Sequence, residues 1–344
     1  MADDAPPSGD SGQRCYRPVA GRPIAWPDDF GTRFTLFVDT EEEFDWAAPL
    51  RADARSTSAM AALPDGQRRL RDAGASPVYL IDHPVVSDER AVAALGQAVS
   101  DGASVGTQLH PWVNPPLDEV VCPENSFPGN LPRALEAAKL DTLTRAIERA
   151  FGEQPMIYRA GRYGIGPNTA TLLVEAGYRI DSSMRSRYDY SAQTGPDFRA
   201  IGNDGFWLDE EAQLAELPLT TVFTGAARRG GEALYRAIGR LPRGRGIFAR
   251  TGLLARVALT PEDMPLADAM EAVRISLGEG VPILNFSFHS PSLVPGHTPY
   301  VRDAGELRDF WHWWDEMLGL LARSGVRAAG QTELIAALDS AGVQ

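Results

Sequence analysis

Short apolar runs alternate with longer amphipathic stretches along most of the chain. The first clear run is residues 34–38, which mixes aromatic and β-branched side chains, and similar runs lie at 77–81 and 281–288. Such runs are typical of strands that are buried on both faces. Over 133–151 apolar residues recur three and four positions apart, which predicts a helix. The alternation of the two patterns predicts a parallel α/β fold.

The same patterns place further elements along the chain. They predict additional strands at 103–107, 156–158, 178–180, 214–219 and 326–328, and helices at 64–73, 88–99, 167–176, 305–324 and 332–341.

Polar residues with catalytic potential directly follow most of the predicted strands. They are Asp39 and Glu41, Asp82 and His83, Gln108 and His110, Arg159, Asp181, and His289. Ligands bind at the carboxyl ends of the strands in both closed barrels and open doubly wound sheets. Because these polar strand ends are spread over the whole chain, the sequence favours a closed barrel. It contains no glycine-rich nucleotide-binding pattern, which disfavours a nucleotide site.

Composition narrows the class of protein further. The 344 residues are 44% hydrophobic, enough for a large core, and the formal net charge of −13 argues against binding to nucleic acid. Cys15 and Cys122 show no paired spacing, so no disulfide is predicted. We find no signal peptide and no apolar run long enough to span a membrane, and therefore expect a cytoplasmic protein that is not transmembrane.

The expected domain organisation is a flexible, proline-rich tail at 1–28 followed by one barrel domain at 29–342. Residues 226–260 differ from the rest in charge, because they contain eight arginines and a single acidic residue, Glu232. We interpret them as a helical basic insertion that packs on the barrel. A solvated face or an oligomer contact is the simplest role, and contact with an anionic substrate or a membrane surface is the alternative.

Five short motifs stand at predicted strand ends in a fixed order. They are Asp39-Thr-Glu41, Gly106-Thr-Gln-Leu-His110, Tyr158-Arg-Ala-Gly-Arg-Tyr163, Asp181-Ser-Ser183 and Phe288-His-Ser290. Together they resemble the NodB-homology polysaccharide deacetylases, most closely the WalW-type branch, over roughly residues 30–340. The resemblance implies an irregular parallel (β/α) barrel of about seven units. It also implies removal of N- or O-acetyl groups from sugars with one divalent metal, zinc or similar.

The resemblance also implies catalytic roles for four residues. Asp39 matches the general base that activates water, and Arg159 matches the arginine that orients this base. Asp181 matches an acid that supports the site. His289 matches the general acid for the leaving group. Hydrolysis of an amide or ester needs these functions together with an electrophile for the developing oxyanion.

Glu41 and His110 match metal ligands of the family. Its usual motif has two histidines four residues apart, whereas here only His110 is available, so Gln108 or His83 is a candidate additional ligand. A glutamine is a weak ligand for zinc. The alternative hypothesis is therefore that the site binds metal weakly or not at all. Metal-independent relatives of the family act in this way on small C–N substrates such as ureides and cyclic imides.

Trp112 and Tyr163 are the expected substrate-binding residues, with Trp112 as a platform for a sugar ring. Glu42, Glu43 and Asp45 are expected to be solvated or paired with arginines. The leading hypothesis is a carbohydrate deacetylase-like hydrolase acting on a sugar, a polysaccharide precursor or a small acylated substrate. The alternatives are a metal-independent C–N hydrolase on the same scaffold and a barrel that binds carbohydrate or a partner protein without turnover.

Overall fold

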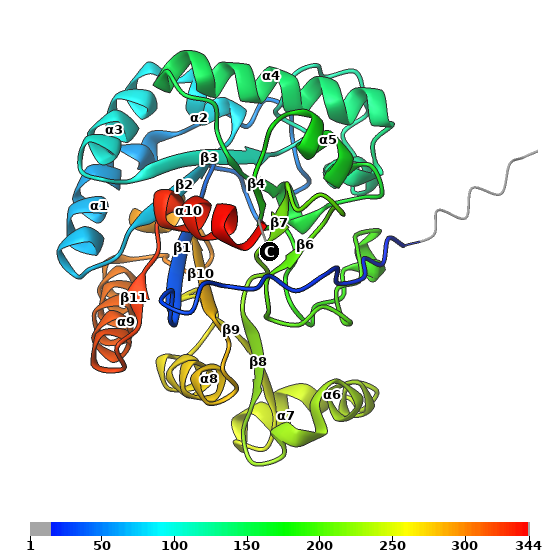
Figure 1. The fold of residues 1–344 in the computed structure, drawn as a ribbon, viewed down its shortest axis with the longest axis vertical. Helices are drawn as coiled ribbons and strands as arrows, with labels where there is room; N and C mark the ends of the chain where they lie inside the picture. The colour runs from blue at the N-terminus through cyan, green and yellow to red at the C-terminus, as the bar shows by residue number, and fades with distance from the viewer. Residues whose placement is uncertain (1–14, 343–344) are drawn as a thin grey trace, which may run out of the picture.

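A curled, mainly parallel sheet forms the centre of the protein (Figure 1). The computed structural model describes residues 15–342, and within them this sheet has nine strands in the order β10-β1-β2-β3-β4-β5-β7-β6, with β11 beside β1. The strands are β1 (Arg33–Thr40), β2 (Pro77–Ile81), β3 (Ser104–Leu109), β4 (Ile157–Ala160), β5 (Ile180–Asp181), β6 (Phe206–Trp207), β7 (Ala215–Glu216), β10 (Ile283–His289) and β11 (Arg327–Ala328). This arrangement confirms the predicted parallel (β/α) barrel, in an irregular form that is open along one side.

Helices follow most strands, as the sequence pattern predicts. Their bounds are α1 (Leu63–Asp72), α2 (His83–Ser87), α3 (Glu89–Ser100), α4 (Arg133–Phe151), α5 (Thr169–Glu175), α8 (Leu266–Gly278), α9 (Ala304–Arg323) and α10 (Gln331–Gly342). Each predicted helix begins and ends within two residues of the observed one. The pattern missed α2, a single turn begun by the side chain of Asp82, and α8.

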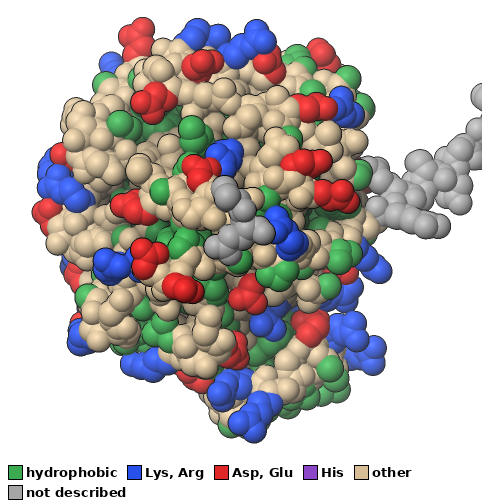
Figure 2. Space-filling model, in the orientation of Figure 1, with side chains coloured by type: hydrophobic (Ala, Val, Ile, Leu, Met, Phe, Trp, Pro, Cys, Tyr) green, Lys and Arg blue, Asp and Glu red, His purple; other side chains and the backbone are tan. Residues whose placement is uncertain are grey.

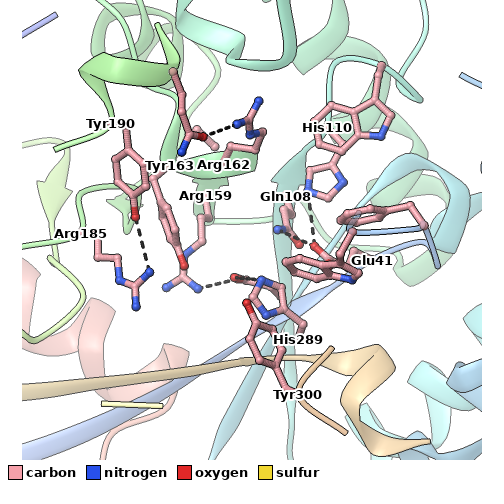
Figure 3. Close-up of a pocket in the computed structure, with 16 residues that line it drawn as sticks. Glu41, Gln108, His110, Arg159, Arg162, Tyr163, Arg185, Tyr190, His289 and Tyr300 are labelled. Atoms are coloured by element: carbon pink, nitrogen blue, oxygen red, sulfur yellow. Dashed lines mark hydrogen bonds and ion pairs between the residues drawn. The ribbon is translucent and has the colours of Figure 1, made fainter. Parts of the chain in front are cut away.

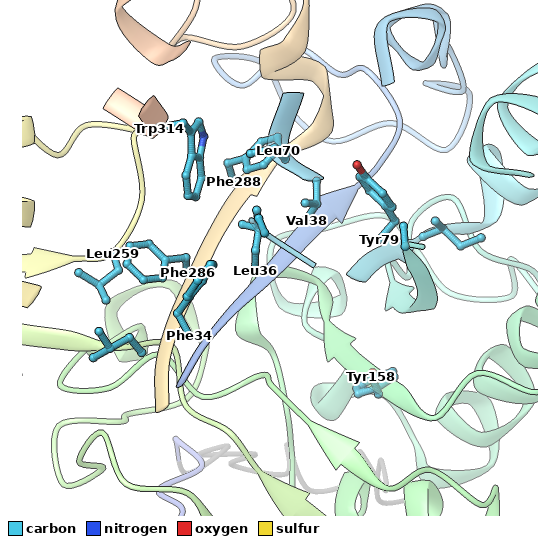
Figure 4. Close-up of a cluster of buried hydrophobic side chains, with 14 of the residues drawn as sticks. Phe34, Leu36, Val38, Leu70, Tyr79, Tyr158, Leu259, Phe286, Phe288 and Trp314 are labelled. Atoms are coloured by element: carbon cyan, nitrogen blue, oxygen red, sulfur yellow. The ribbon is translucent and has the colours of Figure 1, made fainter. Parts of the chain in front are cut away.

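Strand β1 is buried on both of its faces. Phe34, Leu36 and Val38 pack on the outer face against aromatic residues of β10 and α9 (Figure 4). Phe37 points to the inner face, where it belongs to a second cluster that includes α10. Because Ala329, just before α10, donates its N–H to Phe34 at the start of β1, this helix covers the amino end of the barrel.

The open side of the barrel is bridged by Asn285 of β10. Its Nδ2 lies 2.9 Å from Ser182 Oγ and 2.8 Å from the carbonyl oxygen of Leu217. Its backbone N–H donates to Thr220 Oγ1 at 2.9 Å. Together with isolated backbone bonds, such as that from Thr220 N–H to the carbonyl oxygen of Asn285, these side-chain hydrogen bonds take the place of a strand ladder on this side.

The expected flexible tail covers residues 1–28, of which 1–14 lie outside the described residues. The following segment runs along the edge of the sheet beside β6. Tyr16 accepts a hydrogen bond from the backbone of Asp197, and the N–H of Ile24 donates to Gly205 at 3.1 Å.

The basic segment 226–260 extends from the barrel on a two-stranded antiparallel ribbon of β8 (Thr221–Thr224) and β9 (Ala255–Ala258). It contains α6 (Gly231–Gly239) and α7 (Gly244–Arg250). Basic side chains gather in the lower part of Figure 2, where Figure 1 places these helices. Among the helices of residues 15–342, none combines the length and hydrophobicity needed to cross a bilayer.

Candidate active site

The carboxyl ends of β1, β3, β4 and β10 meet at one cavity of about 210 Å³ (Figure 3). Strand register explains why distant residues converge there. Asp39 on β1 stands opposite His289 on β10, and Gln108 on β3 stands opposite Arg159 on β4. All four line the cavity together with Glu41 and His110.

The buried carboxylate of Asp39 lies between a guanidinium and an imidazole. Its Oδ1 accepts from Arg159 Nη1 at 2.5 Å, and its Oδ2 lies 3.7 Å from His289 Nε2. The other nitrogens of Arg159 donate to Ser182, with Nε 2.8 Å from the carbonyl oxygen and Nη2 3.0 Å from Oγ. Ser182 thus fixes the orientation of the arginine, and the arginine fixes Asp39.

His289 is held by a residue that sequence analysis did not single out. Its Nδ1 lies 2.6 Å from Glu262 Oε2, and its backbone N–H donates to Glu262 Oε1 at 3.0 Å. Burial of the ring opposes its charged form, but the carboxylates of Glu262 and Glu41 outweigh it and raise the pKa of His289 to about 10. The only available signal for Glu262 was an acid shortly after the strand at 255–258.

Glu41 lies beside Gln108 and His110 on the other side of the cavity. Its Oε2 is 3.2 Å from Gln108 Nε2 and 3.5 Å from His110 Nε2. Burial raises the pKa of Glu41 to about 8, although the imidazoles of His289 and His110 favour its charged form. Among the described residues, Glu41 Oε1 and Gln108 Oε1 are buried without any hydrogen-bond partner.

Glu42 is not the solvated bystander that we expected. Its side chain is fully buried and accepts from His110 Nδ1 at 2.8 Å and from Trp112 Nε1 at 2.7 Å. Its backbone N–H donates to Asp82 Oδ2 at 2.8 Å. Because successive side chains of an extended segment point to opposite sides, Glu41 faces the cavity while Glu42 supports the histidine from behind. The carboxylate of Glu43 also has a partner, since its Oε1 accepts a hydrogen bond from Ser58 Oγ at 2.8 Å.

Two overlapping groups of side chains have the composition of a metal site. Donor atoms of Glu42, Asp82 and His110 lie within 4.8 Å of one another. However, Glu42 is already bound by His110 and Trp112, an arrangement typical of a carboxylate that orients a ligating histidine. Within residues 15–342, Glu41 Oε1, Gln108 Oε1 and His110 Nε2 have no strong hydrogen-bond partner, and a carboxylate, an amide oxygen and an imidazole fit a divalent cation.

Asp181 and His83 do not line the cavity. Asp181 pairs in register with Tyr158 and Glu216, and its carboxylate accepts from Ser183. Burial raises its pKa to about 7. The ring of His83 lies on α2 with Nδ1 3.3 Å from Ser87 Oγ, apart from the donors around Glu41.

Trp112 and Tyr163 both line the cavity, in different ways. Trp112 is only 2% exposed, and its ring stacks on that of His110 at a centroid distance of 4.3 Å. Tyr163 has a positive φ of 60°, as does the preceding Arg162 at 55°. Gly161 allows this turn to approach the site, since a Cβ there would lie 2.5 Å from His110 Cδ2.

Aromatic and basic residues and one glutamine complete the wall of the cavity. They are Phe44, Trp46, Arg162, Arg185, Tyr190, Gln193 and Tyr300. Trp46 packs edge-on against His289 at 5.0 Å between ring centroids. The sequence signal for Phe44 and Trp46 was their place directly after the acidic motif. The other residues lie on loops whose positions depend on the tertiary fold.

Comparisons with known proteins support the architecture. No family model matches the chain, and no curated protein matches it at a significant level. Among solved structures, a protein of Mycobacterium smegmatis proposed to be a polysaccharide deacetylase is similar with a TM-score of 0.50 and 18% identity, over 95% of each chain. Puue allantoinase is similar with a TM-score of 0.52 and 12% identity, over 92% of each chain. At these identities the likeness shows that the chain shares their barrel fold.

Proposed function

We propose that the protein is a hydrolase of the carbohydrate-deacetylase type, which removes an N- or O-acetyl group from a sugar or a polysaccharide precursor. One observation carries the proposal. The carboxylate of Asp39 lies between Arg159 and His289, with its Oδ2 turned toward the imidazole, at the wall of a cavity that also contains Glu41 and His110. The proposal is supported because hydrolysis of an acyl group needs a base, an acid and an electrophile, and these side chains would supply all three around one cavity.

Asp39 is the general base in this mechanism. Its Oδ2 takes a proton from the water that attacks the acyl carbon, while Oδ1 stays bound to Arg159. Asp181 and Ser182 act as positioning residues, since Ser182 binds Arg159 directly and Asp181 precedes it at the end of β5. A divalent cation held by Glu41, His110 and Gln108 would polarise the acyl carbonyl and increase the acidity of the water.

His289 is the general acid. Because its pKa is about 10, the ring carries a proton at neutral pH and can deliver it from Nε2 to the departing nitrogen or oxygen of the sugar. Glu262 holds Nδ1, so the proton that is transferred is the one on Nε2, next to Asp39.

The order of the five motifs supports the finer proposal that the protein is closest to the WalW-type branch. Trp112 serves this site mainly by supporting His110 and Glu42, while Tyr163 and Trp46 offer aromatic surface to a substrate.

The direct test is acetate release from a panel of N-acetylated and O-acetylated monosaccharides. The wild-type protein is expected to release acetate, and Asp39→Asn is expected to lower kcat by a factor of at least about 100. Asp45→Asn is the matched control, because Asp45 is exposed in the same acidic segment. Equal rates for the wild type and Asp39→Asn would overturn the proposal.

A metal-independent C–N hydrolase is the second candidate, favoured by one specific contact. Gln108 Nε2 lies 3.2 Å from Glu41 Oε2 and can hold this carboxylate without a cation. Metal analysis of the purified protein and assays after chelation separate the two. One bound Zn, Ni, Co or Mn per chain and loss of activity with chelator support the deacetylase, whereas full activity after chelation supports the second candidate. A protein that binds sugar without any turnover, and equally well after Asp39→Asn, would be a binding barrel.

A further inference from the structure

One wall of the active-site cavity is made of arginine and tyrosine side chains. Figure 3 shows Arg185 and Tyr190 on the side away from Glu41 and His110, with Arg159, Arg162 and Tyr163 between the two sides. The cavity therefore has an acidic side, where acyl transfer is proposed, and a basic side to which the mechanism assigns no role.

Arg185 is the key residue of this basic side, because its charge has no counter-ion. Among residues 15–342 it forms no ion pair, and its one side-chain hydrogen bond is a long one of 3.5 Å from Nη1 to Tyr190 Oη. Its Nε is buried and has no partner within the same residues. A guanidinium that is withdrawn from water without an anion is unfavourable, and its planar set of N–H groups matches a carboxylate or phosphate.

Arg159, in the same cavity, shows what a satisfied arginine looks like. All its nitrogens bind, to Asp39 and to two oxygen atoms of Ser182. Arg185 instead rests on aromatic rings, with its guanidinium carbon 4.0 Å from the ring centroid of Tyr188 and 5.5 Å from that of Tyr163. Stacking of this kind fixes the plane of the guanidinium while leaving its N–H edge free for a ligand.

Neighbouring arginines increase the positive potential at this wall. Arg256 of β9 lies over Tyr188 at 3.6 Å, and its Nε is likewise buried without a partner among the described residues. Arg162 lines the cavity and donates to Ser126 and, at 2.6 Å, to Gln193. Neither arginine forms an ion pair with any residue in 15–342.

We propose that Arg185, supported by Tyr190 and Arg162, binds an anionic group of the substrate, so that the substrate is an acylated sugar that carries a carboxylate or a phosphate. This rests on the proposed function for the identity of the acyl sugar, whereas the anion site itself rests on Arg185. An anion held at Arg185 directs the rest of the molecule toward Asp39 and His289, and repulsion from the carboxylate of Asp39 disfavours the reverse orientation.

The test compares binding of neutral and acidic sugars by titration calorimetry. The probes are N-acetylglucosamine, its uronic acid N-acetylglucosaminuronate, and N-acetylglucosamine 6-phosphate. The Asp39→Asn protein is used so that turnover does not interfere. We expect an acidic probe to bind about tenfold or more tightly than the neutral one. The tighter of the two acidic probes identifies carboxylate or phosphate as the preferred group.

Arg185→Gln, added to Asp39→Asn, is expected to abolish most of this preference while leaving binding of the neutral sugar within about twofold. Arg250→Gln is the matched control, because it removes one positive charge from an exposed site on α7. If Arg185→Gln does not fold, Arg185→Lys is tested in its place. Lysine keeps the positive charge but lacks the planar pair of N–H groups of a guanidinium, so this variant should retain only part of the preference for acidic probes.

The inference is overturned if the parent protein binds neutral and acidic probes equally, or if the Arg185 variant weakens both to the same extent. Its failure is distinguishable from failure of the proposed function. A clear anion preference without acetate release leaves the anion site standing and removes the hydrolase. Acetate release from neutral and acidic sugars with equal kcat/KM, and an unchanged kcat/KM for the acidic sugar in Arg185→Gln, removes the anion site and leaves the hydrolase standing.

Discussion

Glu262 binds His289 at two points, through Nδ1 of the ring at 2.6 Å and through the backbone N–H at 3.0 Å. The ring can therefore neither rotate nor present its other nitrogen to the cavity. The same contact is a main reason why the ring keeps a proton at neutral pH, against the effect of its burial. Orientation and protonation of the proposed acid thus depend on a residue that does not itself line the cavity.

The first prediction concerns the alkaline limit of activity. Since the pKa of His289 is about 10, the acid form is lost only as pH rises through this value, and kcat should fall there. Glu262→Gln removes the negative charge, so the alkaline limb should move to lower pH by one unit or more. The pH–rate profile checks this, and an unchanged limb would contradict the assigned role. Asp45→Asn serves again as the control.

The same imidazole predicts a pH dependence of stability. The pKa of His289 is raised from an ordinary value near 6.5, so its stabilising effect is complete below about pH 6.5 and is lost as pH rises toward 10. His289→Gln should flatten the fall of the unfolding free energy over this window. Denaturant titrations at several pH values measure the difference, and parallel curves for both proteins would refute it.

Glu41 gives a prediction of the same direction at lower pH. Burial raises its pKa to about 8, so the folded state holds a proton that the unfolded state releases above about pH 4.5. In the presence of a chelator, the wild type should lose stability on the order of a few kcal/mol between pH 5 and 8, because the charged form is disfavoured in the fold. Glu41→Gln should lack this loss and should also bind added Zn²⁺ more weakly. Thermal melts with and without zinc test both outcomes.

Trp112 is predicted to act through its indole N–H. Trp112→Phe keeps a ring that can stack on His110 but leaves Glu42 Oε1 without its donor at 2.7 Å. We expect a loss of about 1–3 kcal/mol in unfolding free energy and a roughly tenfold or greater loss of metal affinity. Trp311→Phe is the matched control, since Trp311 lies on α9 away from the cavity. Equal effects of the two substitutions would argue against this role.

Arg159 and Asp39 are predicted to be strongly coupled. Each single substitution, Arg159→Met or Asp39→Asn, changes a buried ion pair, and Arg159→Met should cost about 3–5 kcal/mol because it leaves a buried carboxylate unpaired. The double substitution should cost clearly less than the sum of the two. A double-mutant cycle from denaturant unfolding measures the coupling, and strict additivity would contradict it.

Much of the architecture could be predicted from local patterns. The strand before Asp39 and the helix at 133–151 have strong periodic signals, and the structure has both. Helix α8 was missed, and its buried residues, such as Ala269 and Val273, are mixed with other apolar residues that are only partly buried. Nothing in the chain near residue 285 indicates that β10 lies beside β1, because this pairing joins segments about 250 residues apart.

The site residues at the ends of strands could be predicted from the sequence, whereas those on the connecting loops could not. Asp39, His110 and His289 follow clear strands, and the structure brings them to one cavity. Glu42 was misjudged because a run of acids resembles a solvated turn, and only tertiary contacts show that it serves a histidine. Arg185 and Glu262 lie on connections whose course depends on the whole fold, so no local pattern distinguishes them.

The hydrogen bonds of Asn285 have a mechanical consequence for the molecule. A barrel closed by strand ladders has a fixed circumference, whereas here the side-chain amide of Asn285 and a few isolated backbone hydrogen bonds, such as that from Ser287 N–H to Leu259, join β10 to the segments across the open side. The ring can widen there by lengthening these few hydrogen bonds, with the ladders between its paired strands intact. Ser182 is also the residue that holds Arg159, so any such widening would be transmitted directly to the pair formed by Arg159 and Asp39.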